Sequence, residues 1–134
     1  MIQMELAQIL ITETREEQVI MLRELNGQRS FPIVIGSYEA ITLNRKLSDA
    51  KAPRPLTHDL IDNIIKGLNA KLTSILITQL KSNTFYAKLV LEQNSHKVEI
   101  DARPSDAIIL AIQSKVPIFV SEEVFAGLNN KTSE

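Results

Sequence analysis

The stretch DARPSDAIILAIQSKVPIFV, residues 101–120, decides the fold class of this chain. Ser105 is a helix-capping residue, and the run after it to about residue 114 is apolar nearly all round, which is typical of a buried helix. Residues 116–120 then predict a strand. Further strands are predicted at 2–12, 18–25, 31–35, 72–80, 84–92 and 97–102. We therefore expect an α+β fold with mixed or antiparallel sheets and a few helices.

Two more helices are predicted before this stretch, and a short one after it. Ser37 is expected to cap a helix that runs to about residue 43, and Thr57 a helix at about 58–69 that Asn69 closes. In the second helix an apolar stripe at helical spacing predicts the buried face, with His58 and Asp59 away from it. The stripe is formed by Leu60, Ile61, Ile64, Ile65 and Leu68. A terminal helix begins at Ser121, and residues 129–134 are expected to be frayed.

An internal repeat is visible in the strand-rich parts of the chain. VIMLREL…FPIVI (19–35) resembles SILITQL…FYAKLVL (74–91), and each is followed by Arg-Pro, a helix and an apolar strand. The copies cover about 18–80 and 72–120 and share the strand at 72–80. We expect two intertwined β-β-α-β-like repeats about a pseudo-twofold axis.

Composition limits the classes of function. The 134 residues fit a single domain, 1–134. The absence of cysteine excludes disulfides and thiolate metal sites, and two histidines exclude a histidine-rich metal cluster. A net charge of −1 excludes a generally basic nucleic-acid footprint, so phosphate contacts require a local patch. No apolar run reaches about 18 residues and no signal peptide is recognisable, so we expect no membrane segment and a cytoplasmic protein.

The first candidate site is Arg54-Pro55-Leu56-Thr57-His58-Asp59. It follows the most basic window of the chain, NRKLSDAKAPRP (44–55). Arg54, the basic loop and the free N–H groups of the helix start together form a plausible phosphate cradle. His58 and Asp59 supply a base and a metal-binding oxygen. The alternative is structural, since Thr57 and Asp59 are ordinary helix-start residues and His58 can simply hydrogen-bond the loop.

The second candidate site is Asp101-Ala102-Arg103-Pro104-Ser105-Asp106. Its carboxylates, with Glu99 on the same strand face, are of the type that holds a divalent cation for phosphodiester hydrolysis. The structural alternative is that Asp101 pairs with Arg103 and that Ser105 and Asp106 only start the buried helix. Glu39 is a third candidate, either a helix-dipole partner or a carboxylate at the mouth of a site. No standard catalytic signature is present.

The strings FPIVIGSYEA (31–40), RPLTHDL (54–60), TFYAKLVL (84–91) and DARPSDAIILA (101–111), followed by PIFVSEEV (117–124), resemble the bifunctional nuclease domain family. The resemblance runs from about residue 4 to residue 128. It implies an α+β fold of two intertwined repeats and an RNase and DNase activity, as reported for plant members. Many bacterial members add a C-terminal helical hairpin. Nine positions match the family motif: Glu39, Arg54, Thr57, His58, Asp59, Asp101, Arg103, Ser105 and Asp106.

The leading hypothesis is therefore a metal-assisted nuclease for RNA or DNA. In it, Asp59, Asp101 and Asp106 bind Mg²⁺ or Mn²⁺. Arg54 and Arg103, with Thr57 and Ser105, bind phosphate, while His58 acts as general acid or base and Glu39 is a further catalytic carboxylate.

Two rival functions stay open. One is a non-catalytic regulatory module that binds nucleic acid or protein, and the other is a small-ligand sensor between the repeats. We also expect a homo-oligomer, because the strands at 2–12 and 116–120 have apolar outer faces.

Overall fold

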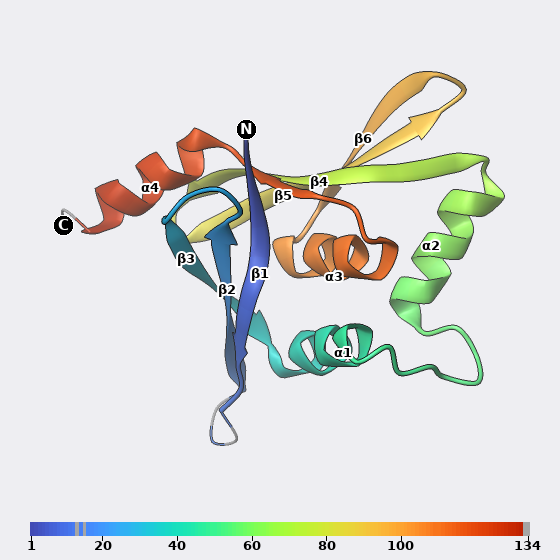
Figure 1. The fold of residues 1–134 in the computed structure, drawn as a ribbon, viewed down its shortest axis with the longest axis horizontal. Helices are drawn as coiled ribbons and strands as arrows, with labels where there is room; N and C mark the ends of the chain where they lie inside the picture. The colour runs from blue at the N-terminus through green and yellow to red at the C-terminus, as the bar shows by residue number, and fades with distance from the viewer. Residues whose placement is uncertain (13, 15, 133–134) are drawn as a thin grey trace.

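Within residues 1–12, 14 and 16–132, which a computed structural model describes, seven strands form one mixed sheet accompanied by four helices (Figure 1). The α+β class expected from the sequence is confirmed. The strands are β1 (Ile2–Leu10), β2 (Glu17–Glu24), β3 (Ser30–Gly36), β4 (Ala70–Lys81), β5 (Thr84–Gln93), β6 (His96–Ala102) and β7 (Ile118–Val120). The helices are α1 (Ser37–Leu47), α2 (Thr57–Gly67), α3 (Pro104–Ser114) and α4 (Glu122–Thr132).

The strand order in the sheet is β3-β2-β1-β7-β4-β5-β6. Only the β4–β7 pairing is parallel, and the other neighbours are antiparallel. The short strand β7 joins the two antiparallel groups, since it pairs with both β1 and β4. Because β1 and β7 lie inside the sheet, the edges that remain for another chain are β3 and β6. The expected homo-oligomer stays a prediction.

Helix α3 lies in the angle between the β1–β3 and β4–β5 parts of the sheet (Figure 1). Its residues from Ala107 to Ala111 are all buried, at 0–2 % exposure, as the apolar run of the sequence predicts. This helix therefore fills the centre of the core, and its first turn is held in a fixed position between the sheet and helices α1 and α2.

The helix starts differ from those predicted. Ser37, Thr57 and Ser105 are not caps, because the helices begin one or two residues earlier, with Gly36, Leu56 and Arg103 in the N-cap positions. In α2 the cap comes instead from Asp59, whose Oδ2 accepts a hydrogen bond from the Leu56 N–H at 2.9 Å. Helix α1 also continues four residues beyond the predicted end, which carries Arg45 and Lys46 onto its last turn.

Helix α2 is rotated relative to the prediction. Only Ile65 of the apolar stripe is buried, whereas Leu60, Ile64 and Leu68 are 53 %, 51 % and 60 % exposed. His58, placed away from the stripe by the sequence, is 5 % exposed and points inward. The reason is that α2 packs with its first turn on α3 and its flank on β4, so a polar residue finds a buried partner while apolar residues stay open.

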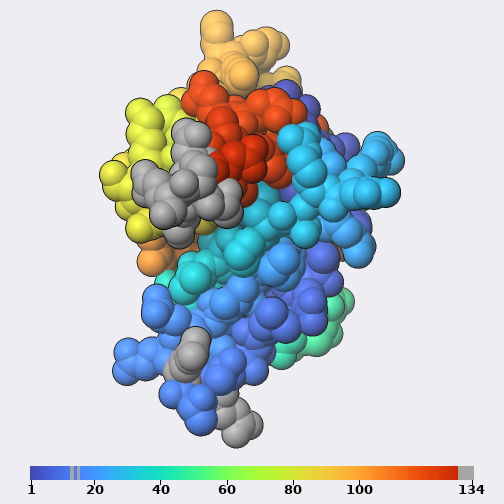
Figure 2. Space-filling view, turned by 90° about the vertical axis from the view of Figure 1, so that its left-hand side faces the viewer, coloured from blue at the N-terminus to red at the C-terminus, as the bar shows by residue number. Residues whose placement is uncertain are grey.

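Helix α4 is fastened to the β2–β3 hairpin. Phe125 makes an edge contact with Phe31, with ring centroids 5.6 Å apart, and the Arg29 guanidinium lies 4.0 Å from the Phe125 ring centroid. Figure 2 shows this helix beside the hairpin. The tail expected to fray is helical as far as residue 132, and residues 133–134 lie outside the described part.

The antiparallel hairpins β2–β3 and β4–β5 lie within the two segments that the sequence predicts to be repeats. Each leads to an Arg-Pro helix start and then to a strand, but α1 follows the first hairpin where β6 follows the second. The repeat itself stays a prediction. No helix in the described ranges has the length and hydropathy needed to cross a membrane.

Candidate functional site

Four of the predicted site residues meet in one polar network at the starts of α2 and α3. The His58 Nε2 atom lies 2.9 Å from Asp106 Oδ1, and Arg103 donates to Asp106 Oδ2 at 3.1 Å. Arg103 also donates to Glu39 Oε1 at 3.1 Å, which brings in the first turn of α1. The two Arg-Pro motifs, 49 residues apart in the chain, thus contribute to the same network.

Asp106 is the centre of this network. The hydrogen bond from His58 and the Arg103 guanidinium hold the pKa of the Asp106 carboxyl below its usual range, against the opposing effect of its burial. The hydrogen bond to Asp106 and its negative charge, followed by those of Glu39, raise the pKa of Arg103. His58 is buried, and its backbone carbonyl accepts a hydrogen bond from Gln113 Nε2 at 3.0 Å. These contacts form a largely buried link between the starts of α2 and α3.

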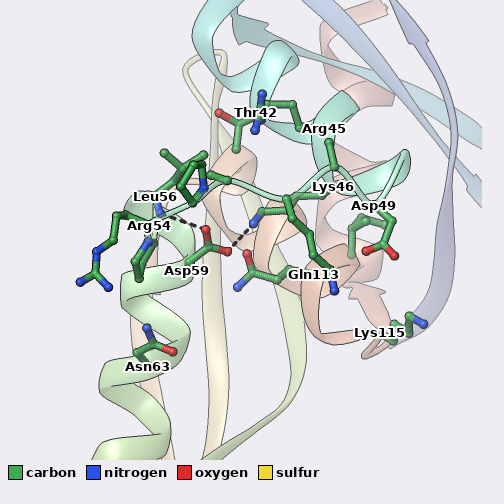
Figure 3. A pocket seen from close by; sticks show the side chains of 16 residues that line it. Thr42, Arg45, Lys46, Asp49, Arg54, Leu56, Asp59, Asn63, Gln113 and Lys115 are labelled. Atoms are coloured by element: carbon green, nitrogen blue, oxygen red, sulfur yellow. Dashed lines mark hydrogen bonds and ion pairs between the residues drawn. The ribbon is translucent and has the colours of Figure 1, made fainter.

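A basic hollow lies on the other side of the α2 start. Its volume is about 450 Å³, and it is enclosed by the end of α1, the loop 48–56, the start of α2 and the end of α3 (Figure 3). Five cationic and two acidic residues line it, in a chain whose net charge is −1. They are Arg45, Lys46, Lys51, Arg54 and Lys115, with Asp49 and Asp59. The hollow is thus a local patch of positive charge.

Asp59 and Lys46 form an ion pair within the basic hollow. Lys46 Nζ lies 2.5 Å from Asp59 Oδ1, and the two side chains point toward each other in Figure 3. The Lys46 ammonium, together with the Leu56 N–H, lowers the pKa of Asp59. Asp59 is therefore ionised at neutral pH and belongs to the hollow, while its neighbour His58 belongs to the polar network.

A second hollow of about 380 Å³ lies beside the start of α3, between β3 and the β4–β5 turn. Arg103 and Ser105 line it, as predicted, but so do the carboxylates of Glu17 and Glu39. With Arg103 already paired to Glu39 and Asp106, this hollow carries no excess of positive charge. It is the less favourable of the two for a phosphate.

The three predicted metal ligands are not brought together. Asp59 is paired with Lys46 and Asp106 with His58 and Arg103, while Asp101 lies on the exposed strand β6 opposite Lys88. Across the described ranges, no group of three or more His, Asp or Glu side chains is arranged to hold a metal ion. The residues as placed do not fit the Mg²⁺ or Mn²⁺ site that the sequence predicts.

Some residues of the basic hollow were not singled out by the sequence. Lys115 comes from the end of α3, far along the chain, and no motif marks it. Gln113 lies two residues earlier, within α3, and its buried Oε1 has no hydrogen-bond partner among the described residues. Thr57, in contrast, is exposed at the start of α2 and makes no capping bond.

Comparison with known proteins identifies the family of this chain. The model of the bifunctional nuclease domain matches residues 20–132, a range that includes both Arg-Pro helix starts. The chain belongs to the bifunctional nuclease domain family. An uncharacterised protein of Mycobacterium tuberculosis H37Rv is 40 % identical over 118 residues, which is 88 % of this chain and 70 % of the relative.

Plant members of the family are more distant. Bifunctional nuclease 1 of Oryza sativa subsp. japonica is 25 % identical over 109 residues, which is 79 % of this chain and 33 % of the relative. Bifunctional nuclease 2 of Arabidopsis thaliana is 26 % identical over 94 residues, 68 % of this chain and 29 % of the relative. The chain thus spans about a third of these plant proteins.

Proposed function

We propose that this bifunctional nuclease domain binds the sugar–phosphate backbone of RNA or DNA in the basic hollow and cleaves it there. The observation that carries the proposal is the gathering of five cationic residues around one hollow in a chain of net charge −1. Phosphate contacts supply most of the sequence-independent affinity of a protein for nucleic acid. The names of the plant relatives supply the reaction class, since these proteins are called bifunctional nucleases.

Within the hollow, Arg54 is the residue we expect to hold a phosphate. It is exposed, it precedes Pro55 and is therefore extended, and it stands beside the N-terminus of α2. A guanidinium matches two phosphate oxygens at once, which also fixes the orientation of the backbone. Lys51, Arg45 and Lys115 surround the same space and extend the path of the strand.

The Asp59–Lys46 pair is the candidate for the chemistry. The ionised Asp59 accepts a hydrogen bond from the attacking water or hydroxyl and takes its proton as the new phosphorus–oxygen bond forms. Lys46 Nζ neutralises the charge that develops on the phosphate oxygens. A carboxylate of lowered pKa is a weak base, so Asp59 passes this proton on to solvent water, and its larger contribution is to orient the nucleophile. The leaving oxygen takes its proton from water.

The polar network has a positioning role in this scheme. By joining α2 to α3, the His58–Asp106 bond fixes the α2 start, which carries Asp59, against the end of α3, which carries Lys115. The proposal does not require a metal ion, because the carboxylates of the described residues form no metal-binding cluster. The assay tests metal dependence directly.

The test is a cleavage assay on labelled single- and double-stranded RNA and DNA, with Mg²⁺, Mn²⁺ or EDTA. Four proteins are prepared identically: wild type, Arg54→Ala, Asp59→Asn and the control Lys81→Ala, which removes an exposed lysine outside the hollow. We expect cutting by wild type and the control, and at least tenfold less by the other two. Equal cleavage by all four proteins would show that the basic hollow is not the site of cleavage.

A second arm separates the two hollows. The double variant Asp101→Asn, Asp106→Asn changes the second Arg-Pro motif and leaves the lining of the basic hollow intact. If that variant alone lost activity while staying folded, the reaction would belong to the start of α3. Binding without turnover by every protein would favour the non-catalytic module, a function that the buried position of His58 also supports.

A further inference from the structure

Strand β6 is an open edge of the sheet, and its outer side is well suited to pairing with another strand. The β5–β6 hairpin closes through Asn94 and Ser95, both with positive φ (51° and 67°), so Gln93 and His96 form the hydrogen-bonded pair next to the turn. Hydrogen-bonded and non-bonded pairs then alternate along β6. The backbone N–H and C=O groups of Lys97, Glu99 and Asp101 therefore point away from β5. At the opposite edge, Pro32 of β3 lacks an N–H to donate.

An apolar groove lies next to this edge, between α2 and the β5–β6 hairpin. Its volume is about 300 Å³, and the hairpin projects beyond the rest of the molecule in Figures 1 and 2. Among the described residues, Gln93 is the one polar residue of its lining, which otherwise consists of apolar residues of α2 and of strands β4 to β6, among them Val98 and Ile100. Ile100, on the edge strand, is 43 % exposed. Contiguous exposed apolar side chains rimmed by polar residues are typical of an interaction surface.

We propose that a second copy of this chain occupies the edge, with β6 of the two copies paired antiparallel about a twofold axis through Glu99. In this register Lys97 lies opposite Asp101 of the partner subunit, and the relation repeats on the other side of the axis. Val98 lies opposite Ile100 of the partner subunit on the face that carries the groove. A twofold contact is self-complementary by construction, and β6 has the charge pattern that such a contact needs.

The pairing changes three energetic terms in the same direction. Three hydrogen-bonded pairs contribute about six backbone hydrogen bonds to groups that otherwise face solvent. Two Lys–Asp pairs lie directly across the new strand boundary, where opposite charges stabilise an antiparallel pair. The apolar floors of the two grooves become one surface. The two Glu99 side chains meet at the axis, and Lys88, 4.0 Å from Glu99 in each copy, offsets their repulsion.

Reversing the charges of Lys97 and Asp101 tests whether β6 pairs with β6 of a second copy. Analytical ultracentrifugation is run at micromolar to submillimolar concentration on wild type, Lys97→Asp, Asp101→Lys, the double variant and the control Lys81→Asp. We expect dimers for wild type, the control and the double variant. Each single reversal opposes like charges twice and should weaken the dimer at least tenfold. A monomeric wild type, or single variants as dimeric as wild type, would overturn the proposal.

Disulfide cross-linking tests the register of the β6–β6 pairing. Because the chain contains no cysteine, only the introduced cysteines can react. Residues opposite each other in a hydrogen-bonded pair have Cα atoms about 5.5 Å apart, within the range of a disulfide. Glu99→Cys should therefore form a covalent dimer on oxidation. Asp101→Cys, on the same strand, should not, since its Cα lies about 14 Å from its twofold mate. Cross-linking of Asp101→Cys or Val98→Cys in place of Glu99→Cys would refute this register.

Discussion

The His58 Nε2 atom lies 2.9 Å from Oδ1 of Asp106, so one side-chain pair joins the first turns of α2 and α3 across 48 residues of sequence. His58 is almost completely buried, and Asp106 is also held by Arg103. A pair in such a place contributes to stability through the cost of leaving either partner alone. It gives the domain a pH-dependent connection between the two Arg-Pro motifs.

Asp106→Asn should reduce stability mainly at neutral pH. The pKa of Asp106 is lower in the folded state than in the unfolded chain, where it is about 3.9. Its contribution is therefore complete above the unfolded pKa and is lost as the pH falls through the folded pKa. We expect a loss of about 1–3 kcal/mol at pH 7 that shrinks toward pH 3. Urea unfolding across this pH range measures it.

A double-mutant cycle with His58→Ala and Asp106→Ala identifies the source of that loss. Residues in direct contact show coupling energies of about 0.5–3 kcal/mol. We expect a coupling above about 1 kcal/mol at pH 7. Strict additivity of the two substitutions would mean that the bond contributes nothing and that each residue acts through other neighbours.

The start of α2 gives a second prediction, about caps. Thr57 makes no capping bond, whereas the Asp59 carboxylate accepts the Leu56 N–H. Thr57→Ala should therefore change the free energy of unfolding by less than about 0.5 kcal/mol, and Asp59→Ala should lower it by about 1 kcal/mol. Thermal unfolding of the two variants compares them directly. A larger loss for Thr57→Ala would restore Thr57 as the cap.

The sequence predicts local features of the fold where one pattern dominates. The all-round apolar run of α3 predicts its burial, and Asn69, with φ 60°, follows the end of α2 as expected. The predicted helix starts are one or two residues too late, because Ser37, Thr57 and Ser105 have the side chains of good N-caps but lie inside the first turn of their helices. Local preference does not select between a cap position and its neighbours, whereas tertiary packing does.

The site could be predicted only in part, for a similar reason. Sequence motifs identify Arg54, Asp59, His58 and Asp106, but not that α2 turns His58 inward and Asp59 outward. That division depends on the rotation of α2 against α3, which is set by contacts between distant residues. Lys115 joins the hollow because α3 ends there, and a single lysine after a buried helix carries no signal of its own.

Two glycines give opposite predictions. A Cβ at Gly127, in α4, would stand 2.9 Å from the Leu80 carbonyl oxygen, so the helix must shift to admit it. A Cβ at Gly67, at the end of α2, meets nothing within 4 Å. Gly67→Ala should raise stability by about 0.5–1 kcal/mol through lower chain entropy, whereas Gly127→Ala should reduce it. Chemical denaturation of both variants checks the sign, and a stabilising Gly127→Ala would contradict the close packing of α4 on β4.

Arg54 gives a prediction on nucleic-acid binding that does not depend on turnover. If its guanidinium neutralises one phosphate, Arg54→Ala should weaken binding equally across sequences and reduce the slope of log K against log salt by about 1. Fluorescence anisotropy with labelled single strands in EDTA measures the slope. Lys81→Ala should keep the wild-type slope. An unchanged slope for Arg54→Ala would show that the nucleic-acid backbone does not contact Arg54.

Lys115 connects stability to the basic hollow. It ends α3 with φ 57°, in the left-handed region that glycine adopts most readily, and it also lines the hollow. Lys115→Gly should therefore raise the free energy of unfolding by about 0.5–1 kcal/mol while weakening nucleic-acid binding. Lys115→Asn is the matched control, since asparagine tolerates this conformation but carries no charge. Both variants should bind nucleic acid less tightly than wild type, because both lack the positive charge. Unchanged binding by both would show that Lys115 contributes only to the helix end.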